Sequence, residues 1–352
     1  NDIGESAVKF LSVSDLRIDL DDVALRYGHH TGDPTLRECI AEQYDGLSAE
    51  QIVVTSGASE AIFSLNAALV KPGDHVVVEH PNYPSLYDIP QSLGCEVSLL
   101  ELQYDKFFKP DLGELEALMT ANTRMISFTH PNNPTGSMIS VGELEALIEF
   151  CENRDVFLLF DETYRDLDFK NALPAAATLS PKAISVSTMS KCYGLPGIRI
   201  GWLATQDPSI VDAVLTIREQ VTITNNALGE AIALHVLRDR QHYLNRARQH
   251  VEANRKRVTD WIESHPAFEW VPPEAGVVGL PRIRQSVDVD PEALYRLLAE
   301  KYRTFAVPGR CFGLENRYFR LGFGATGDEI EKGLENLDSA LAELSPTAQL
   351  AN

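Results

Sequence analysis

Short apolar runs alternate with helical patterns through the first 205 residues, and this alternation constrains the fold more than any other feature. Each run is bounded by Gly, Pro, Asp or Asn; the runs cover residues 51–55, 75–79, 96–100, 125–129, 156–160, 183–187 and 200–204. Strands that alternate with helices of about ten or more residues predict an α/β fold, with a mostly parallel central sheet sandwiched by helices. Ligand sites of such sheets lie beyond the carboxyl ends of the strands, so motifs at those positions are the first candidates.

The rest of the chain predicts a second, smaller α+β domain. Its 352 residues are enough for one large and one small domain. We expect an N-terminal segment over 1–25, a large domain over 26–240, a small domain over 241–345 and a tail over 346–352. A polar helical stretch over 226–264, with an apolar stripe, should link the two domains. The stripe consists of Leu228, Ala231, Leu234 and Leu237, and the small domain should contain strands at 277–280 and 318–323 and helices at 291–301 and 326–344.

Composition excludes several classes of partner. The net charge is −20, which repels nucleic acid and anionic membranes, so we expect neither as a partner. The five cysteines show neither metal-ligand spacing nor a disulfide framework, and no apolar run is long enough to span a membrane. We therefore expect a cytoplasmic protein without a metal site. Because the chain begins at Asn1 instead of a methionine, we also expect further residues before it.

Lys191 follows the apolar run 183–187 and lies among hydroxyl residues and glycines. An amine in this setting can form a Schiff base with an aldehyde cofactor. Thr188, Ser190 and Arg199 can hold the phosphate of such a cofactor through charge-assisted hydrogen bonds.

A second candidate phosphate site follows the run 51–55. There the sequence Ser-Gly-Ala-Ser-Glu-Ala opens a helix, whose first N–H groups and positive dipole end attract anions. We therefore assign Gly57, Ala58 and Ser59 to the same phosphate.

Asp161 comes directly after the run 156–160. An aspartate after a strand is most often a helix cap. A carboxylate there can also pair with a pyridinium nitrogen and keep it protonated, so that the ring accepts electrons from the substrate Cα. Tyr164, three residues later, can donate a hydrogen bond to the 3′-oxygen of the ring.

Together these motifs resemble the cofactor site of fold-type-I aminotransferases that depend on pyridoxal 5′-phosphate (PLP), the aspartate aminotransferase superfamily. The similarity extends over nearly the whole chain. It implies that Lys191 carries PLP and that the N-terminal segment packs with the small domain. It also implies that Asn133 contacts the 3′-oxygen, that Tyr83 stacks on the ring and that Arg320 binds the substrate α-carboxylate. Tyr27, five residues before Gly32, would reach the phosphate of the neighbouring subunit, which implies a homodimer with shared active sites.

Gly4 and Glu5 lie in a segment that closes over the substrate in relatives. The sequence here departs from the Asn-Glu-Asn-Pro-like form of simple aminotransferases and is similar to the capreomycidine synthase-like subgroup, whose members act on hydroxylated arginines. Glu5 would suit a cationic substrate tail by paired charge. The segment near His29 and His30 is a second candidate to contact the substrate side chain.

The resemblance implies transfer of an amino group between an α-amino acid and a 2-keto acid, with Lys191 as general base at Cα and proton donor at C4′. Three alternatives remain open: a PLP enzyme that cyclises, eliminates from or oxidises a (hydroxy)arginine-like amino acid, a C–S β-lyase, and the effector domain of a PLP-sensing regulator. A regulator needs a DNA-binding module, and no basic stretch supplies one. No second arginine is identifiable as a clamp for a dicarboxylate.

Overall fold

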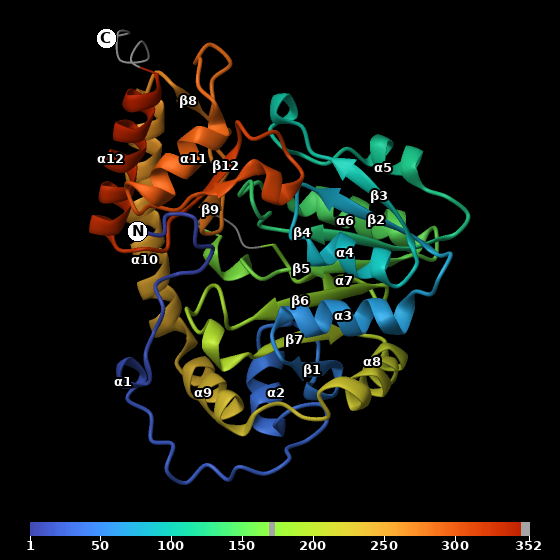
Figure 1. The fold of residues 1–352 in the computed structure, drawn as a ribbon. Helices are drawn as coiled ribbons and strands as arrows, with labels where there is room; N and C mark the ends of the chain where they lie inside the picture. Colours follow the sequence, from blue (N-terminus) through green and yellow to red (C-terminus); the bar gives the residue numbers. More distant parts are fainter. Residues whose placement is uncertain (169–172, 346–352) are drawn as a thin grey trace.

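The computed structural model describes residues 1–168 and 173–345, and its centre is a seven-stranded sheet (Figure 1). The sheet order is β1-β7-β6-β5-β4-β2-β3. The strands are β1 (Ile52–Thr55), β2 (His75–His80), β3 (Glu96–Glu101), β4 (Thr123–Thr129), β5 (Phe157–Asp161), β6 (Ala183–Thr188) and β7 (Gly201–Thr205). Strands β2 to β6 pair in parallel, whereas β7 is antiparallel to both β6 and β1. The predicted fold class is confirmed.

Helices cover both faces of this sheet, and consecutive strand residues point to opposite sides. Leu158 of β5 packs in the cluster with α6, while Leu159 packs in the cluster with α3 and α8. Burial on both faces explains the apolar runs of the inner strands, whereas the edge strand β3 is only partly buried. The helices are α1 (Val13–Leu16), α2 (Pro34–Ala41), α3 (Ala58–Leu69), α4 (Ser85–Ser92), α5 (Leu112–Leu118), α6 (Val141–Glu152), α7 (Ala176–Leu179), α8 (Pro208–Val221), α9 (Ala227–Arg238), α10 (Arg240–Ser264), α11 (Pro291–Glu300) and α12 (Gly327–Leu344).

Several helices begin at side chains that satisfy free backbone N–H groups. Asp33 accepts a hydrogen bond from Leu36 N before α2, and Ser140 and Thr326 form capping boxes with Glu143 and Glu329. Within the described residues, no helix is both long and apolar enough to cross a membrane.

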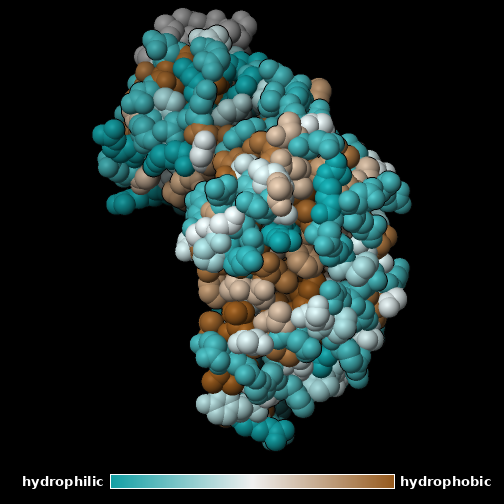
Figure 2. All heavy atoms as spheres, turned by 90° about the vertical axis from the view of Figure 1, so that its right-hand side faces the viewer, coloured by the Kyte–Doolittle hydropathy of each residue, from teal (hydrophilic) through white to brown (hydrophobic). Residues whose placement is uncertain are grey.

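The C-terminal part contains two small sheets beside α10, α11 and α12 (Figure 1). One pairs β8 (Phe268–Glu269) with β10 (Arg282–Ile283); the other orders β11 (Val307–Pro308), β12 (Phe319–Gly322) and β9 (Val278–Gly279). The smaller, upper part of the molecule has a mostly hydrophilic surface, whereas the lower part exposes an apolar area on the face in Figure 2. The predicted domain boundaries at 25, 240 and 345 stay a prediction, and the tail 346–352 lies outside the described residues.

The N-terminal segment joins the C-terminal part to the large sheet. Ile3 N donates to Phe305 O at 3.0 Å, and Ile3 O accepts from Gly322 N at 2.7 Å. Farther along, Val8 N donates to Lys191 O at 3.1 Å. Residues far apart in sequence are thereby fixed around one lysine.

The predicted helical stretch over 226–264 forms two consecutive helices, because α9 ends at Arg238 and α10 begins at Arg240. The predicted apolar stripe holds only in part: Leu237 is buried and Leu234 packs against the core, but Leu228 is 39% exposed. The buried face of α9 also includes Ile232 and Val236. A row with a spacing of three drifts around a helix of 3.6 residues per turn, so it cannot follow one buried face.

Candidate active site

One cavity of about 370 Å³ gathers most of the predicted site residues at the carboxyl ends of β4, β5 and β6. It is lined by Ser6, Ala58, Ser59, Tyr83, Thr129, Asn133, Asp161, Thr163, Tyr164, Thr188, Ser190, Lys191, Pro196, Arg199 and Arg320. Side chains from the N-terminal segment, the large sheet and β12 therefore meet in one place. Gly4, Glu5 and Gly57 flank this cavity without lining it.

Lys191 lies three residues beyond the end of β6. Its Nζ donates to Ser6 Oγ at 2.9 Å and lies 3.8 Å from Glu5 Oε1. Burial lowers the pKa of the Lys191 amine, while the nearby Glu5 carboxylate opposes that shift. A larger fraction of the amine is thus neutral near pH 7, which is the form that attacks an aldehyde.

The phosphate end of the cavity is built from backbone that requires glycine. Gly57 has φ of 79°, and a side chain there would clash with Arg199. A Cβ on Gly201 would in turn collide with the backbone of Gly57 and Ala58. Arg199 Nη1 lies 3.5 Å from Ser190 Oγ, so the guanidinium faces the hydroxyls and the start of α3. This arrangement offers a cationic, donor-rich cup for a phosphate.

Asp161 is the last residue of β5 and is buried. Its Oδ1 accepts a hydrogen bond from Thr163 N at 2.9 Å. Burial raises the pKa of the Asp161 carboxyl, and the Lys191 charge partly opposes this. A cationic ring nitrogen placed against the carboxyl would favour its ionised form.

Arg320, on β12, is one of the cationic side chains that line the cavity. Its Nε and Nη2 donate to Gly4 O at 3.2 and 2.7 Å, and its Nη1 donates to Asn133 Oδ1 at 3.0 Å. Burial lowers the pKa of the guanidinium. The planar fork contacts only neutral oxygens in these bonds, so a carboxylate would be a stronger partner.

Tyr164 lies in the cavity, as predicted, and its hydroxyl donates to Ser6 O at 3.0 Å. Burial raises the pKa of this phenol. Its predicted hydrogen bond to the ring oxygen stays a prediction.

The cavity suits a polar aromatic ring with a phosphate. Thr129 Oγ1 and Thr163 Oγ1 are buried in its wall without a hydrogen-bond partner, and buried hydroxyls normally have one. A bound ring with polar substituents would satisfy such groups, and the cup at Arg199 would hold its phosphate. The residues present therefore fit PLP.

The sequence profile of the family "Aminotransferase class I and II" matches residues 12–337. The chain belongs to this family. It is a fold-type-I enzyme whose cofactor is pyridoxal 5′-phosphate. The resemblance to fold-type-I, PLP-dependent aminotransferases is confirmed, and so is the presence of capreomycidine synthase-like relatives.

Two relatives with different named activities are similar to this chain in sequence. Capreomycidine synthase of Streptomyces vinaceus is 32% identical over 97% of this chain and 89% of that protein. The aspartate aminotransferase of Thermotoga maritima is 28% identical over 96% and 86%.

Two solved structures, one of an aminotransferase and one of a cyclase, are similar to this chain in fold. A PLP-dependent aminotransferase from Streptococcus suis 89-1591 superposes with a TM-score of 0.92 at 32% identity, covering 98% of this chain and 94% of that one. The PLP-dependent cyclase OrfR superposes with a TM-score of 0.90 at 31% identity, covering 97% and 93%.

Tyr27 does not reach this cavity within its own chain. It is 80% exposed and, with Gly28 and His29, lines a separate cavity of about 500 Å³ beside α9. His30 is held by an exposed contact to Glu219 at 3.1 Å. The roles predicted for Tyr27, His29 and His30 therefore depend on a second subunit.

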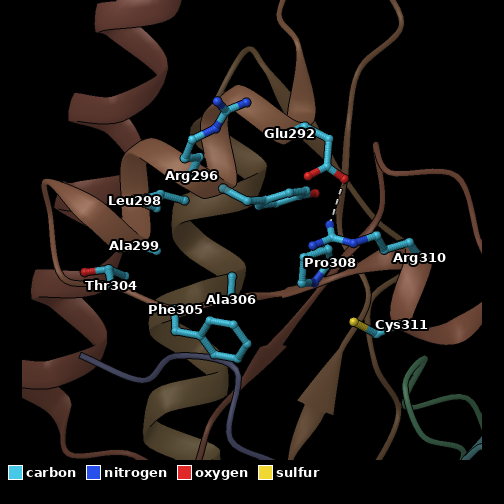
Figure 3. A pocket seen from close by; sticks show the side chains of 11 residues that line it. Glu292, Arg296, Leu298, Ala299, Thr304, Phe305, Ala306, Pro308, Arg310 and Cys311 are labelled. Atoms are coloured by element: carbon cyan, nitrogen blue, oxygen red, sulfur yellow. Dashed lines mark hydrogen bonds and ion pairs between the residues drawn. The ribbon is translucent and has the colours of Figure 1, made fainter.

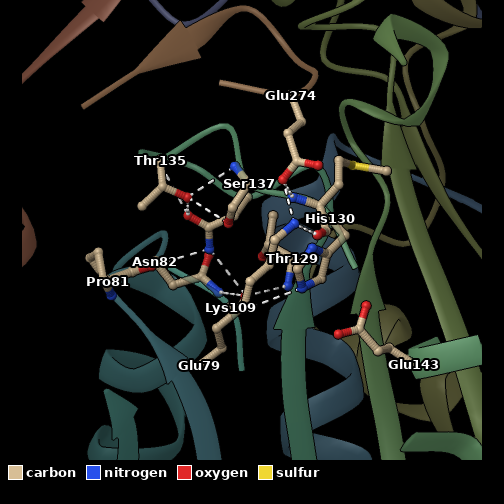
Figure 4. A network of polar contacts seen from close by, with 12 residues as sticks. Glu79, Pro81, Asn82, Lys109, Thr129, His130, Thr135, Ser137, Glu143 and Glu274 are labelled. Carbon is tan, nitrogen blue, oxygen red and sulfur yellow. Dashed lines mark hydrogen bonds and ion pairs between the residues drawn. The ribbon is translucent and has the colours of Figure 1, made fainter. Parts of the chain in front are cut away.

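A buried polar network that the motifs do not indicate lies next to the cavity residue Thr129 (Figure 4). His130 Nε2 lies 2.8 Å from Glu79 Oε1, and both side chains are fully buried. Glu79 Oε2 also accepts from Thr129 N at 3.0 Å and from Asn132 Nδ2 at 3.1 Å. The network fixes the loop that presents Asn133. Its signal in the sequence is an acid at the end of the apolar run 75–79, because a buried charge requires partners.

Another cavity, of about 380 Å³, lies between α11 and the segment around β11 (Figure 3). Its charged rim contains an ion pair of 2.8 Å between Arg310 and Glu292. None of its lining residues is a predicted site residue, and we assign the chemistry to the cavity around Lys191.

Proposed function

We propose that this chain is an aminotransferase that moves an amino group between an α-amino acid and a 2-keto acid. The observation that carries the proposal is the meeting of Lys191, Asp161 and Arg320 in one cavity. Bound PLP supplies an electron sink for the bond broken at the substrate Cα. Each of the three side chains is placed for a separate task.

Lys191 acts as the base that removes the proton from the substrate Cα and as the acid that delivers a proton at C4′ of the cofactor. Its lowered pKa supports this role, because a base works best when its pKa is near the working pH. Arg320 exchanges its bonds to Gly4 O for a two-pronged bond to the substrate carboxylate. Asp161 holds a proton on the ring nitrogen by paired charge.

The enzyme works as a homodimer in this proposal, with Tyr27 reaching the phosphate of the partner. Support comes from its 80% exposure and from the exposed Leu25 nearby. Apolar side chains gathered on one face of the larger part are also consistent with a covered surface (Figure 2). All five cysteines are free thiols, which supports the cytoplasm as the compartment.

The position of Glu5 supports a proposal for the charge of the substrate side chain. Its carboxylate lies 3.8 Å from Lys191 Nζ and its side chain is 38% exposed, so it borders the place where the substrate amine must arrive. We propose a substrate with a cationic side chain, such as a guanidinium.

Glu5 also favours a second candidate function, a cyclase or elimination enzyme acting on a hydroxyarginine-like amino acid. The 32% identity with capreomycidine synthase supports this alternative. The side chains around PLP serve the first proton transfer in either reaction, so they do not discriminate between the two.

One experiment separates the two functions. Holoenzyme is mixed with arginine, hydroxyarginine or other amino acids in turn, without a keto acid. Transamination predicts one equivalent of pyridoxamine phosphate and one of keto acid per active site, detected by absorbance and mass spectrometry. Repeated turnover with a cyclic product or free ammonia, and no pyridoxamine phosphate, would instead establish the second function. Release of a thiol from a sulfur amino acid would establish a C–S lyase.

A further inference from the structure

Arg218, on the last turn of α8, is an arginine with no exposed surface. Its Nε donates to Glu60 Oε1 at 3.0 Å, and its Nη2 donates to Asn225 Oδ1 at 2.9 Å. Its Nη1 donates to the backbone carbonyl of His30. A guanidinium buried in this way is retained only if its hydrogen bonds are satisfied, and here three different segments satisfy them.

One of these segments leads to the phosphate cup of the same chain. Glu60, on the first turn of α3, accepts from the backbone N–H of Ser56 with its other oxygen. Ser56 immediately precedes Gly57, whose backbone lies against Arg199. The direction of the cup's N–H groups thus depends on Glu60, and the position of Glu60 depends on Arg218.

A second segment leads to the arm over residues 27–32, of which residues 27–30 are exposed. His30 O is held by Arg218, and Thr31 O accepts from Val54 N at 2.9 Å. Asn225 closes the cluster, because its Nδ2 donates to Val54 O at 3.2 Å. The arm is fixed at the end that follows Tyr27.

We propose that Arg218 is a positioning residue. Its buried guanidinium holds two phosphate-binding elements in position. One element is the turn over 56–59 of its own site, and the other is the arm that carries Tyr27 to the site of the partner. The second half rests on the proposed homodimer. Loss of Arg218 should therefore weaken PLP binding at both sites of the dimer, although its side chain lies outside the lining of the PLP cavity.

The first test measures PLP affinity of purified Arg218→Gln and Glu60→Gln enzymes. We expect each PLP dissociation constant to rise by about tenfold or more, the effect of weakening one charge-assisted hydrogen bond. The matched control is Arg282→Gln, which removes an arginine paired with Glu269 at 2.8 Å in the C-terminal part. The control should lower thermal stability without changing PLP affinity. Unchanged PLP affinity in Arg218→Gln or in Glu60→Gln, or equal effects of all three variants, would overturn the proposal.

The second test separates the two elements by mixing subunits, with differently tagged chains purified as mixed dimers. The first mixed dimer pairs an Arg218→Gln chain with a Lys191→Ala chain, so the one lysine-bearing site has an altered turn and an intact partner arm. The second pairs wild type with a Lys191→Ala/Arg218→Gln chain, so that site has an intact turn and an altered arm. The reference pairs wild type with Lys191→Ala alone.

The measured quantity is the amount of PLP that borohydride fixes on Lys191, determined at increasing PLP concentrations. Weaker loading of both mixed dimers than of the reference supports the proposal. Normal loading of the second dimer, or an exclusively monomeric protein, would overturn the arm half of the proposal, and normal loading of the first would overturn the turn half. The amino-donor assay above reports transamination independently, so failure here would leave the proposed reaction unaffected.

Discussion

The guanidinium of Arg320 donates a 3.0 Å hydrogen bond to Oδ1 of Asn133 and so links β12 to the loop after β4. The same guanidinium holds the carbonyl of Gly4, one residue before Glu5. A substrate carboxylate that binds Arg320 competes with these contacts. Carboxylate binding and the position of the N-terminal segment are therefore coupled through one side chain.

Arg320→Gln should lower kcat/KM for amino acids by about 10- to 100-fold, the effect of losing hydrogen bonds between charged groups. The loss should be much smaller for an amine that lacks a carboxylate, because that amine never used the clamp. Steady-state kinetics with an amino acid and its decarboxylated analogue measure the difference. An equal loss for both compounds would show that Arg320 acts on the fold instead of on the carboxylate.

Lys191→Ala should abolish covalent attachment of PLP while the phosphate cup still binds it. The reason is that Lys191 Nζ contacts Ser6, whereas the cup is built by Gly57, Arg199 and Ser190. Borohydride treatment followed by peptide mapping should recover the label on Lys191 in the wild type and on no lysine in the variant. Turnover should fall by several orders of magnitude, and label on a different lysine in the wild type would refute the assignment.

Asp161→Ala should slow removal of the Cα proton by about 10² or more, as for other pre-organised electrostatic groups. Single-turnover measurements with a deuterated amino acid report this step directly. Glu162→Gln is a suitable control: Glu162 is also buried, but it contacts Ser185 and Ala176 instead of lining the cavity. If the single-turnover rate of Asp161→Ala is unchanged, a residue other than Asp161 holds the proton on the ring nitrogen.

The sequence predicted the strands of the central sheet to within two residues at each end, because strands buried on both faces are continuous apolar runs. It also predicted residues that meet around Lys191. Asn133 and Asp161 lie at the carboxyl ends of strands that share one edge of the sheet, whereas Arg320 lies within β12. In contrast, Arg218 resembles an ordinary polar residue on a surface helix. Its burial depends on Glu60, which lies 158 residues away, and no local pattern contains that information.

Two further features have no signal in the local sequence. The break between α9 and α10 at Asp239 carries neither Pro nor Gly, so the two helices read as one in the sequence. The contact of the Tyr164 hydroxyl with Ser6 O has no local signal either, because it depends on the N-terminal segment folding back into the cavity.

Tyr27→Phe should leave the dimer intact and weaken PLP binding by about tenfold, since it removes one hydroxyl hydrogen bond to a charged phosphate. Sedimentation should show a homodimer for both proteins, with an interface burying more than about 2,000 Å². The exposed position of Tyr27 means that the substitution has little effect on folding within one chain. A fully active monomer at micromolar concentration would exclude the shared site.

Glu5 should control both the charge of Lys191 and the choice of substrate. Its carboxylate raises the pKa of the Lys191 amine, against the larger lowering by burial. Attachment of PLP to the apoenzyme requires the neutral amine, so its rate should rise with pH and reach a plateau below the range of a free lysine. In Glu5→Gln the opposing charge is gone, the pKa of Lys191 falls further, and the midpoint of the rate profile should move to lower pH.

The same variant tests the substrate class. Glu5→Gln should lose about 10- to 100-fold in kcat/KM for amino acids with a cationic tail, the effect of breaking a hydrogen bond between charged groups, and much less for neutral ones. Glu329→Gln, at the capping box of α12, removes a carboxylate elsewhere and serves as the control for net charge. A shifted pH midpoint with unchanged selectivity would leave Glu5 a role in tuning Lys191 and would remove the argument for a cationic substrate. If neither quantity changes, Glu5 is a solvated side chain, and selectivity must come from the arm of the partner that carries His29 and His30.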